Sequence, residues 1–591
     1  MKEFFKYVLA TITGMLLMGI LVCGMFFMMM VSAMMAGEQK PSLHDDSVLH
    51  LQLNGMLTER ATSDPMSFLL GSSDMESIGL NDMVKALKVA AKDKHIKGVY
   101  LEAGALGADF ASIQELRKAI LDFKKSGKFV YAYGDAYTQG CYYVCSAADK
   151  LYLNPSGLIE WQGLASQPMF YKDLLEKVGV KMQVFKVGTY KSAVEPFTRT
   201  DMSPENREQV QVFIDDIWKN VIADVAQGRK LSADTLNAYA NRYVSFAAPD
   251  EFVKLKMVDA LYYIDQMRDE LRKAIGNKTV HLVAASDVAR LYEETAETSD
   301  HVAVYFAEGT IVDEVASRFG GMRESQIVGS KVVEDLDKLA SDEHVKAVVL
   351  RINSGGGSAY ASEQMWRAIQ LLKKKKPVVV SMSGMAASGG YYMSCGADYI
   401  FAEPTTLTGS IGIFGMVPDA TGLLTDKLGL HFDIVKTNEA ADFGAMGRPF
   451  NANEAAAMQQ HVERGYALFL KRVAEGRKMS VADVDKIAQG RVWTGSAALP
   501  LKLVDKMGTL DDAIAEAATR GKMKDKTQFR SYPAPAPWFE DLMDKQKEQY
   551  IERELRAVLG ANYTTLTFLS NLQGRARLQA RIPFDPNFVG M

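Results

Sequence analysis

The chain has 591 residues, enough for two or more domains of ordinary size. Hydrophobic residues make up 48% of it and charged residues 24%, which is the composition of a globular protein and not of a disordered one. Because 68 basic residues face 72 acidic ones, the formal charge is −4, and this balance argues against nucleic acid as a partner.

Residues 1–40 are predicted to form a membrane anchor. No residue from Tyr7 to Gly37 is charged, and about 20 apolar residues suffice to cross a bilayer. A cleaved signal peptide has a shorter apolar region of about 7–15 residues, so we expect an uncleaved transmembrane helix over about 7–36. Lys2 and Lys6 precede this run and acidic residues follow it, which favours a single pass with the body outside the cytoplasm.

The main body is predicted to be a tandem duplication, with copies at 45–300 and 301–530. "DKHIKGVYL" (93–101) matches "DEHVKAVVL" (342–350), and "YYVCSAAD" (142–149) matches "YYMSCGAD" (391–398), both at a shift of 249. Further pairs, such as "LKMVD" and "LKLVD", follow in the same order along the two copies. Matches in one order at nearly one spacing indicate an internal repeat of roughly 240 residues.

Each copy alternates strand and helix patterns, most clearly the second. "KAVVLRI" and "PVVVSMS" are β-branched runs typical of buried parallel strands, and helical segments follow each of them. This order predicts an α/β core in each half, with further helices at 201–243 and 449–490 outside it. After the break "YPAPAPW", residues 531–591 form a C-terminal extension.

Two cysteines, Cys141 and Cys145, lie four residues apart on an expected helix of the first copy. No histidine and no second cysteine pair joins them, so we interpret them as small buried residues and not as metal ligands. The sequence predicts no metal and no cofactor.

The two copies differ reciprocally at two positions that can carry chemistry. Ser388 of the second copy falls opposite Gln139 of the first, and Lys191 of the first falls opposite Ala440 or Ala441 of the second. Taken alone, Ser388 is typical of a helix N-cap and Lys191 of a surface charge. The reciprocal loss favours a shared site, to which one copy supplies a serine and the other a lysine.

This pair has a definite chemical meaning. A serine hydroxyl attacks a carbonyl when a base removes its proton, and a lysine becomes that base when burial lowers its pKa. Ser388 stands where a strand passes into a helix, so the Gly389 N–H is placed to hold a developing oxyanion. For the second donor we choose Gly356 in the turn "SGGGS".

Four motifs carry a resemblance to a known family: "GTYKSAVEPF" (188–197), "SGGGSAYASE" (354–363), "AASGGYY" (386–392) and "LTGSIGI" (407–413). With them the chain resembles the long, duplicated members of peptidase family S49, the Ser/Lys signal peptide peptidases. The resemblance implies a ClpP/crotonase-like fold in each half, Ser388 as nucleophile, Lys191 as general base and Ser410 supporting the lysine. It also implies a homotetramer on the outer face of a bacterial inner membrane, which degrades cleaved signal peptides and similar apolar peptides.

Two alternatives from other classes stay open at this stage. The same fold hosts enzymes that act on acyl-CoA, although those need neither a membrane anchor nor a buried lysine. A duplicated protein can also become a membrane scaffold after its site decays, although the presence of both Ser388 and Lys191 speaks against this. An activated serine, which reacts with a fluorophosphonate, would distinguish the peptidase from both.

Overall fold

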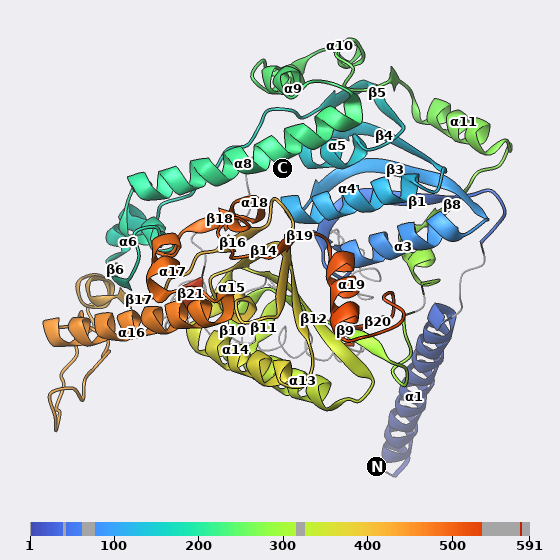
Figure 1. Cartoon of the computed structure of the whole chain (residues 1–591). Coiled ribbons are helices and arrows are strands. Elements are labelled where there is room, and N and C mark those ends of the chain that lie inside the picture. The colour runs from blue at the N-terminus through green and yellow to red at the C-terminus, as the bar shows by residue number, and fades with distance from the viewer. Residues whose placement is uncertain are drawn as a thin grey trace.

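The computed structural model describes residues 2–38, 43–61, 77–292, 294–314, 325–534 and 579–581. Two α/β halves follow each other along the chain, one built on the first part (blue to green) and one on the second (yellow to red) (Figure 1). Each half is organised around a largely parallel sheet whose central strands are buried. The predicted α/β class and duplication are therefore present in the fold.

The first sheet has the order β2-β1-β3-β4-β5-β7, and β8 pairs with the start of β1. Its strands are β1 (Ser47–Thr58), β2 (Ser77–Gly79), β3 (Ile96–Gly107), β4 (Phe129–Tyr137), β5 (Lys150–Ile159), β7 (Ala260–Leu261) and β8 (His281–Ala284). The helices of this half include α3 (Leu80–Lys92), α4 (Phe110–Lys124), α5 (Gln139–Cys145), α6 (Lys172–Val178), α7 (Glu195–Thr198), α8 (Pro204–Arg229), α9 (Ala233–Ala240), α10 (Pro249–Lys254), α11 (Ile264–Ile275) and α12 (Ala285–Ala289). The long helix α8 crosses over the second half (Figure 1).

The second sheet repeats the central order of the first, because β9-β12-β14-β15 corresponds to β1-β3-β4-β5. Its strands are β9 (His301–Glu308), β12 (Val345–Ser354), β14 (Val378–Ala387), β15 (Tyr399–Ala402), β16 (Leu407–Gly409), β18 (Val492–Thr494), β19 (Lys506–Met507) and β20 (Phe529–Tyr532). The helices include α13 (Gly329–Ser341), α14 (Ala359–Lys373), α15 (Gly389–Ser394), α16 (Ala452–Arg477), α17 (Val481–Ile487), α18 (Gly495–Ala498) and α19 (Leu510–Arg520). A short π-helical turn, Gly422–Lys427, follows strand β17 (Phe414–Asp419).

A third, smaller sheet joins the halves and has the order β11-β10-β13-β21-β17-β6. Its members are β6 (Lys181–Lys186), β10 (Thr310–Val312), β11 (Gln326–Val328), β13 (Gly356–Ser358), β17 (Phe414–Asp419) and β21 (Gln579–Arg581). Strand β6 belongs to the first half but pairs antiparallel along the whole of β17 in the second half. The chain segment that follows β6 is thereby carried into the second half.

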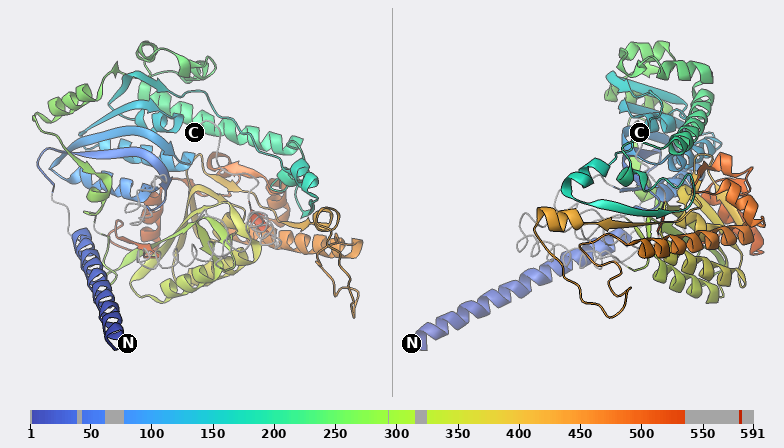
Figure 2. Two further views of the ribbon diagram at one scale, coloured as in Figure 1. Left: turned by 180° about the vertical axis from the view of Figure 1, so that it is seen from behind. Right: turned by 90° about the vertical axis from the view of Figure 1, so that its left-hand side faces the viewer.

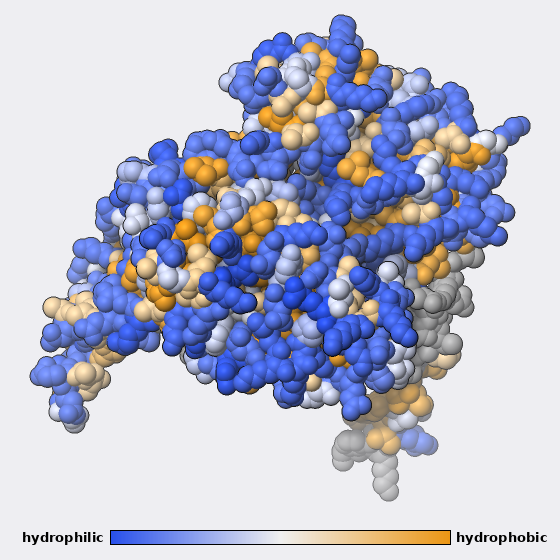
Figure 3. Space-filling model, in the orientation of Figure 1, coloured by the Kyte–Doolittle hydropathy of each residue, from blue (hydrophilic) through white to orange (hydrophobic). Residues whose placement is uncertain are grey.

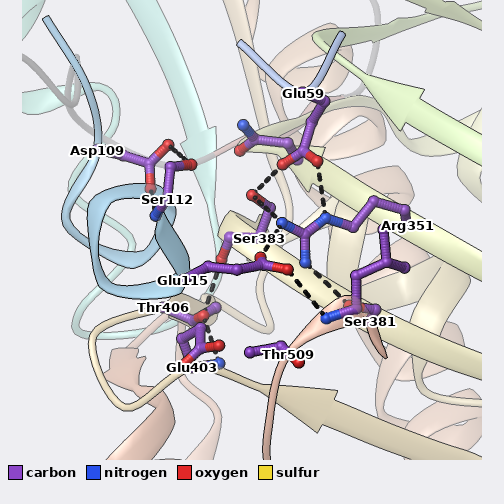
Figure 4. Close-up of polar contacts among 12 residues, drawn as sticks. Glu59, Asp109, Ser112, Glu115, Arg351, Ser381, Ser383, Glu403, Thr406 and Thr509 are labelled. Carbon is purple, nitrogen blue, oxygen red and sulfur yellow. Dashed lines mark hydrogen bonds and ion pairs between the residues drawn. The ribbon is translucent and has the colours of Figure 1, made fainter. Parts of the chain in front are cut away.

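A buried ionic cluster fixes the two halves against each other. Arg351 on β12 contacts two carboxylates of the first half, Glu59 at 2.8 Å and Glu115 at 2.6 Å (Figure 4). Its guanidinium also donates to Ser381 Oγ and Ser383 Oγ, and Ser383 Oγ donates to Glu59. Because all three charged side chains are almost completely buried, this contact depends on the mutual position of the halves.

The N-terminal helix α1 (Lys2–Glu38) runs for 37 residues and extends away from the body (Figures 1 and 2). Across the described ranges, no helix meets the combined length and apolarity expected of a membrane span. The structure thus does not support the transmembrane helix expected over 7–36. Most of the predicted C-terminal extension, 531–591, lies outside the described residues.

Candidate active site

Ser388 occupies a sharp strand-to-helix turn in the second half. It follows the last residue of β14 and precedes the first residue of α15, with φ 56° and ψ −112°. A positive φ is uncommon for a residue with a Cβ, and such strained positions cluster at functional sites. The turn is held by the Ser388 N–H, which donates to the Gly409 carbonyl at 2.8 Å. The sequence predicts the strand–helix junction but not this backbone geometry.

Lys191 approaches Ser388 from the other half of the molecule. It lies in the loop between β6 and α7, and the pairing of β6 with β17 brings that loop to the end of β14. Its Nζ is 2.8 Å from Ser388 Oγ, 3.0 Å from Ser410 Oγ and 3.1 Å from the Ser410 carbonyl oxygen. Ser388 and Ser410, the two serines that the sequence singled out, therefore both lie within hydrogen-bond distance of the Lys191 amine.

The Lys191 amine is enclosed on all sides. Its side chain has no exposed surface, and burial lowers the pKa of the amine well below its ordinary value. Gly490 forms one wall with φ +78°, and a Cβ at that position would lie only 2.6 Å from the Lys191 Cβ. Only glycine fits at position 490, because any side chain there would clash with the backbone end of Lys191. The lysine loop therefore packs directly against the second half.

A polar network that the sequence did not reveal holds the lysine loop. Gln209 on α8 donates from Nε2 to the Tyr190 carbonyl at 3.0 Å and to Ser192 Oγ at 2.9 Å. Its Oε1 accepts from the N–H of Val492 on β18 at 3.2 Å. Gln209 thus ties the loop of the first half to a strand of the second. A glutamine on an amphipathic helix gives no sequence signal for such a role.

The two glycines chosen as oxyanion donors lie on adjacent elements. Gly389 is the first residue of α15, whose first-turn N–H groups lack partners within the helix. The Gly356 N–H, on β13, donates to Ser354 Oγ at 3.1 Å in this structure. Strand β21 pairs antiparallel with β13 over its three residues and continues to Phe414 on β17. The edge of β13 is thus occupied by a segment from the C-terminal part of the chain.

The equivalent position in the first half contains no such pair. Gln139 begins α5, and its Oε1 accepts from the N–H groups of Gln162 and Gly163 at 3.0 and 3.1 Å. Ala440 and Ala441, which correspond to Lys191, lie in an exposed segment of the second half. A lysine therefore meets a serine at the β14–α15 junction of the second half, and not at the corresponding β4–α5 junction of the first half.

Cys141 and Cys145 lie on α5 and are buried. Burial raises the pKa of the Cys145 thiol well above its ordinary value, which disfavours the thiolate that binds metals. Over the described ranges, no group of three histidine, cysteine or acidic side chains has a metal-binding arrangement.

Comparison with known proteins identifies the chain's relatives. The model of peptidase family S49 matches it twice, at residues 122–278 and 370–524. The chain belongs to peptidase family S49. The two matches fall in the two halves, as expected for a long, duplicated S49 peptidase. A CoA-ligase family model also matches residues 310–400, a shorter segment that partly overlaps the second S49 match.

Curated relatives align over most of the S49 chain. "Protease 4" of Salmonella typhi is 38% identical over 493 residues, which cover 80% of this chain and 78% of the relative. "Protease 4" of Haemophilus influenzae is 35% identical, with 86% and 85% covered. "Serine protease SPPA, chloroplastic" of Arabidopsis thaliana is 33% identical, with 81% and 69% covered. This S49 chain is accordingly a serine peptidase, and an acyl-CoA enzyme or a decayed scaffold is not the favoured assignment.

Among solved structures, a point mutant of ClpP1 from Listeria monocytogenes matches 36% of this chain and 93% of its own. The sequence identity is 17% and the TM-score 0.24.

Proposed function

We propose that Ser388 is the nucleophile of this peptidase and Lys191 its general base. The observation that carries the proposal is the 2.8 Å contact between Lys191 Nζ and Ser388 Oγ, formed by side chains from different halves. In the neutral lysine the Nζ lone pair accepts the hydroxyl proton, and the two Ser410 oxygens accept the remaining N–H groups. Ser410 therefore orients the lone pair toward Ser388.

The reaction follows from these contacts. Ser388 Oγ attacks the carbonyl carbon of a peptide while its proton passes to Lys191 Nζ. The oxyanion is held by the N–H of Gly389 and by a second N–H from the glycine turn, for which Gly356 is our candidate. The Lys191 ammonium then gives its proton to the leaving amine. The neutral lysine then deprotonates a water molecule, which attacks the acyl-enzyme carbonyl. As the bond from that carbon to Ser388 Oγ breaks, the Lys191 ammonium returns its proton to Ser388 Oγ.

The substrate is proposed to bind as an extended strand along β13. Support comes from β21, which forms an antiparallel ladder with Gly356, Gly357 and Ser358 in this structure. A strand edge recognises peptide mainly through its backbone, and this suits a peptidase that accepts many sequences. A peptide placed there would run beside the helix that begins directly after Ser388.

We further propose that the substrates are cleaved signal peptides and similar apolar segments, and that the enzyme acts at the outer face of a bacterial inner membrane. The support is the uncharged run from Tyr7 to Gly37 within α1. Large apolar side chains along this helix are exposed, among them Met15, Met18 and Met28. A tether of this kind raises the concentration of peptidase near substrates that remain in the lipid.

Labelling with a fluorophosphonate probe tests the proposed pair. The full-length enzyme should be labelled at Ser388, and both Ser388→Ala and Lys191→Ala should lose the label. Lys191→Arg should also lose it, since a guanidinium stays protonated and accepts no proton. Lys186→Ala, which removes a lysine of β6 outside the site, is the matched control and should label normally. Labelling of Lys191→Ala at the wild-type rate would overturn the proposed base.

Flotation with lipid vesicles tests the proposed attachment. The full chain should float with vesicles, and a chain lacking residues 1–40 should stay in the soluble fraction while the probe still labels it. Flotation of the truncated chain would place the membrane contact elsewhere in the body.

A further inference from the structure

One buried side chain contacts the residues on both sides of Lys191. Gln209 on α8 is 1% exposed, and its Nε2 donates to the Tyr190 carbonyl at 3.0 Å and to Ser192 Oγ at 2.9 Å. Tyr190 directly precedes the lysine in the chain, and Ser192 directly follows it. A single amide group therefore holds the backbone before the lysine and the side chain after it.

The same amide also reaches the part of the second half that holds Ser410. Gln209 Oε1 accepts from the Val492 N–H at 3.2 Å. Val492 is preceded by Arg491, whose carbonyl accepts from the Ser410 N–H at 2.7 Å. Gln209 thus links the lysine loop to the segment that fixes the serine next to the lysine amine.

Comparison with the second copy gives Gln209 a sequence signal that its own helix does not give. Helix α16 repeats α8, because both have 26 residues and each has a side-chain N-cap, Ser203 in α8 and Asn451 in α16. This alignment has a shift of 248 residues, and it places Ala457 opposite Gln209. Ala457 is exposed and has no polar side chain. The glutamine is therefore present in the copy that has the lysine and absent from the copy that lacks it.

A neighbouring contact is instead kept in both copies. Glu195, at the end of the lysine loop, accepts from Asn206 Nδ2 at 2.9 Å. In the second copy Arg448 donates to both carboxylate oxygens of Glu454, each at 2.7 Å. Both Asn206 and Glu454 are the third residues of their helices, and both loop residues precede the dipeptide Pro-Phe. This second contact therefore stabilises the fold whether or not a lysine is present, whereas the Gln209 contact accompanies the lysine.

We propose that Gln209 is a positioning residue of the peptidase, which holds the Lys191 amine at the place where it meets Ser388. The lysine amine stands at the end of a flexible four-carbon chain, so its position depends on how firmly its backbone is held. Catalytic groups must be held to within about 0.5 Å, and a displacement of about 1 Å can cost about 10²-fold in rate. This inference rests on the proposed role of Lys191 as general base. Gln209 acts through the lysine loop and takes no part in the proton transfer.

The same contacts keep the lysine loop closed around its amine. Burial is the cause that lowers the pKa of Lys191, so the shift depends on the exclusion of water. Charged side chains on the adjacent elements have partners of their own. Glu195 accepts hydrogen bonds from α8, Arg491 lies 3.0 Å from Glu208, and Asp485 accepts hydrogen bonds within its own half. A loop released from α8 would admit water to the amine, and the pKa of Lys191 would rise toward its ordinary value.

Gln209→Met tests this role, because it removes the amide at nearly constant volume. With a small peptide substrate kcat should fall about 10²-fold, while KM should change less than about twofold, since the substrate is proposed to bind along β13 and not along α8. The pH at which kcat/KM reaches half its maximum should move to higher pH, because less of the amine is neutral at a given pH. A variant that had merely lost stability would contain fewer folded molecules and would show an unmoved pH midpoint.

Gln211→Met is the matched control on the same helix. Gln211 is exposed on the outer face of α8, where the molecular surface is mostly hydrophilic (Figure 3). Its side chain donates to Asp215 of the same helix, so its loss should change neither kcat nor the pH midpoint. Ser192→Ala is a milder second variant, which removes one of the two contacts beside the lysine and should move the midpoint in the same direction by less. It decides the test if thermal unfolding shows that Gln209→Met does not fold.

Lys191→Ala, measured in the same assay, separates this inference from the proposed function. If Lys191→Ala keeps substantial activity, the proposed general base is wrong. If Lys191→Ala is inactive while folded Gln209→Met has the wild-type kcat, or a lower kcat with an unmoved pH midpoint, the positioning role alone is refuted. If Gln209→Met does not fold, an unmoved midpoint in Ser192→Ala refutes it.

Discussion

Removing the arginine that joins the halves should destabilise the fold in a pH-dependent way. In Arg351→Met, Glu59 and Glu115 lose their counter-ion while they stay buried between the two sheets. Breaking a buried ion pair by removing one partner costs about 3–5 kcal/mol, because an uncompensated charge remains. We expect a loss of this size in the free energy of unfolding at pH 8.

The sign of the pH dependence follows from Glu115. Burial raises the pKa of this carboxyl even though Arg351 opposes the shift. Without the arginine the folded-state pKa rises further above the unfolded value of about 4.3. Between the unfolded and the folded pKa of Glu115, the folded variant holds a proton that the unfolded chain has released. The free energy of unfolding of the variant therefore falls as pH rises through this range. The deficit should be clearly smaller at pH 5 than at pH 8.

Urea unfolding followed by tryptophan fluorescence at both pH values measures this effect. The control Arg351→Met with Glu59→Gln and Glu115→Gln contains no uncompensated charge, so it should recover much of the loss and show little pH dependence. The reasoning is refuted if Arg351→Met matches the wild type at pH 8, or if its deficit is equal at both pH values.

Two further predictions concern the site and its neighbouring strand. Lys191→Met should be inactive yet more stable than the wild type at neutral pH. Burial lowers the pKa of Lys191 in the folded state, so at neutral pH the lysine binds a proton in the unfolded wild type but not in the folded one. The difference in stability between variant and wild type should therefore close as pH approaches the ordinary lysine pKa of about 10.4. A difference in thermal unfolding that widens with pH would contradict this. A chain ending before Gln579 lacks β21 and should show a higher kcat/KM on small peptides with an unchanged unfolding temperature, because the edge of β13 is then open. An unchanged or lower kcat/KM would show that β21 does not compete with substrate.

The sequence predicted that Ser388 and Lys191 meet, but it did not predict the contacts around them. Each copy has lost the reactive side chain that the other keeps, and this pointed to Ser388 and Lys191. The two copies need the same core packing, but a catalytic residue is needed in only one of them, so the copies diverge at such positions. The buried cluster of Arg351, Glu59 and Glu115 left no such signal, since periodicity describes each half and not their mutual orientation. The positive φ of Ser388 was equally hidden, because a serine between small residues does not indicate a strained turn.

The central claim is that Ser388 and Lys191 act as one unit across the two halves. A double-mutant cycle on kcat/KM for a small peptide substrate tests it most directly. Ser388→Ala and Lys191→Ala should each lower kcat/KM by at least about 10⁴-fold, and the double variant should be no worse than either. Substantial activity in Lys191→Ala, or losses that multiply in the double variant, would contradict the claim.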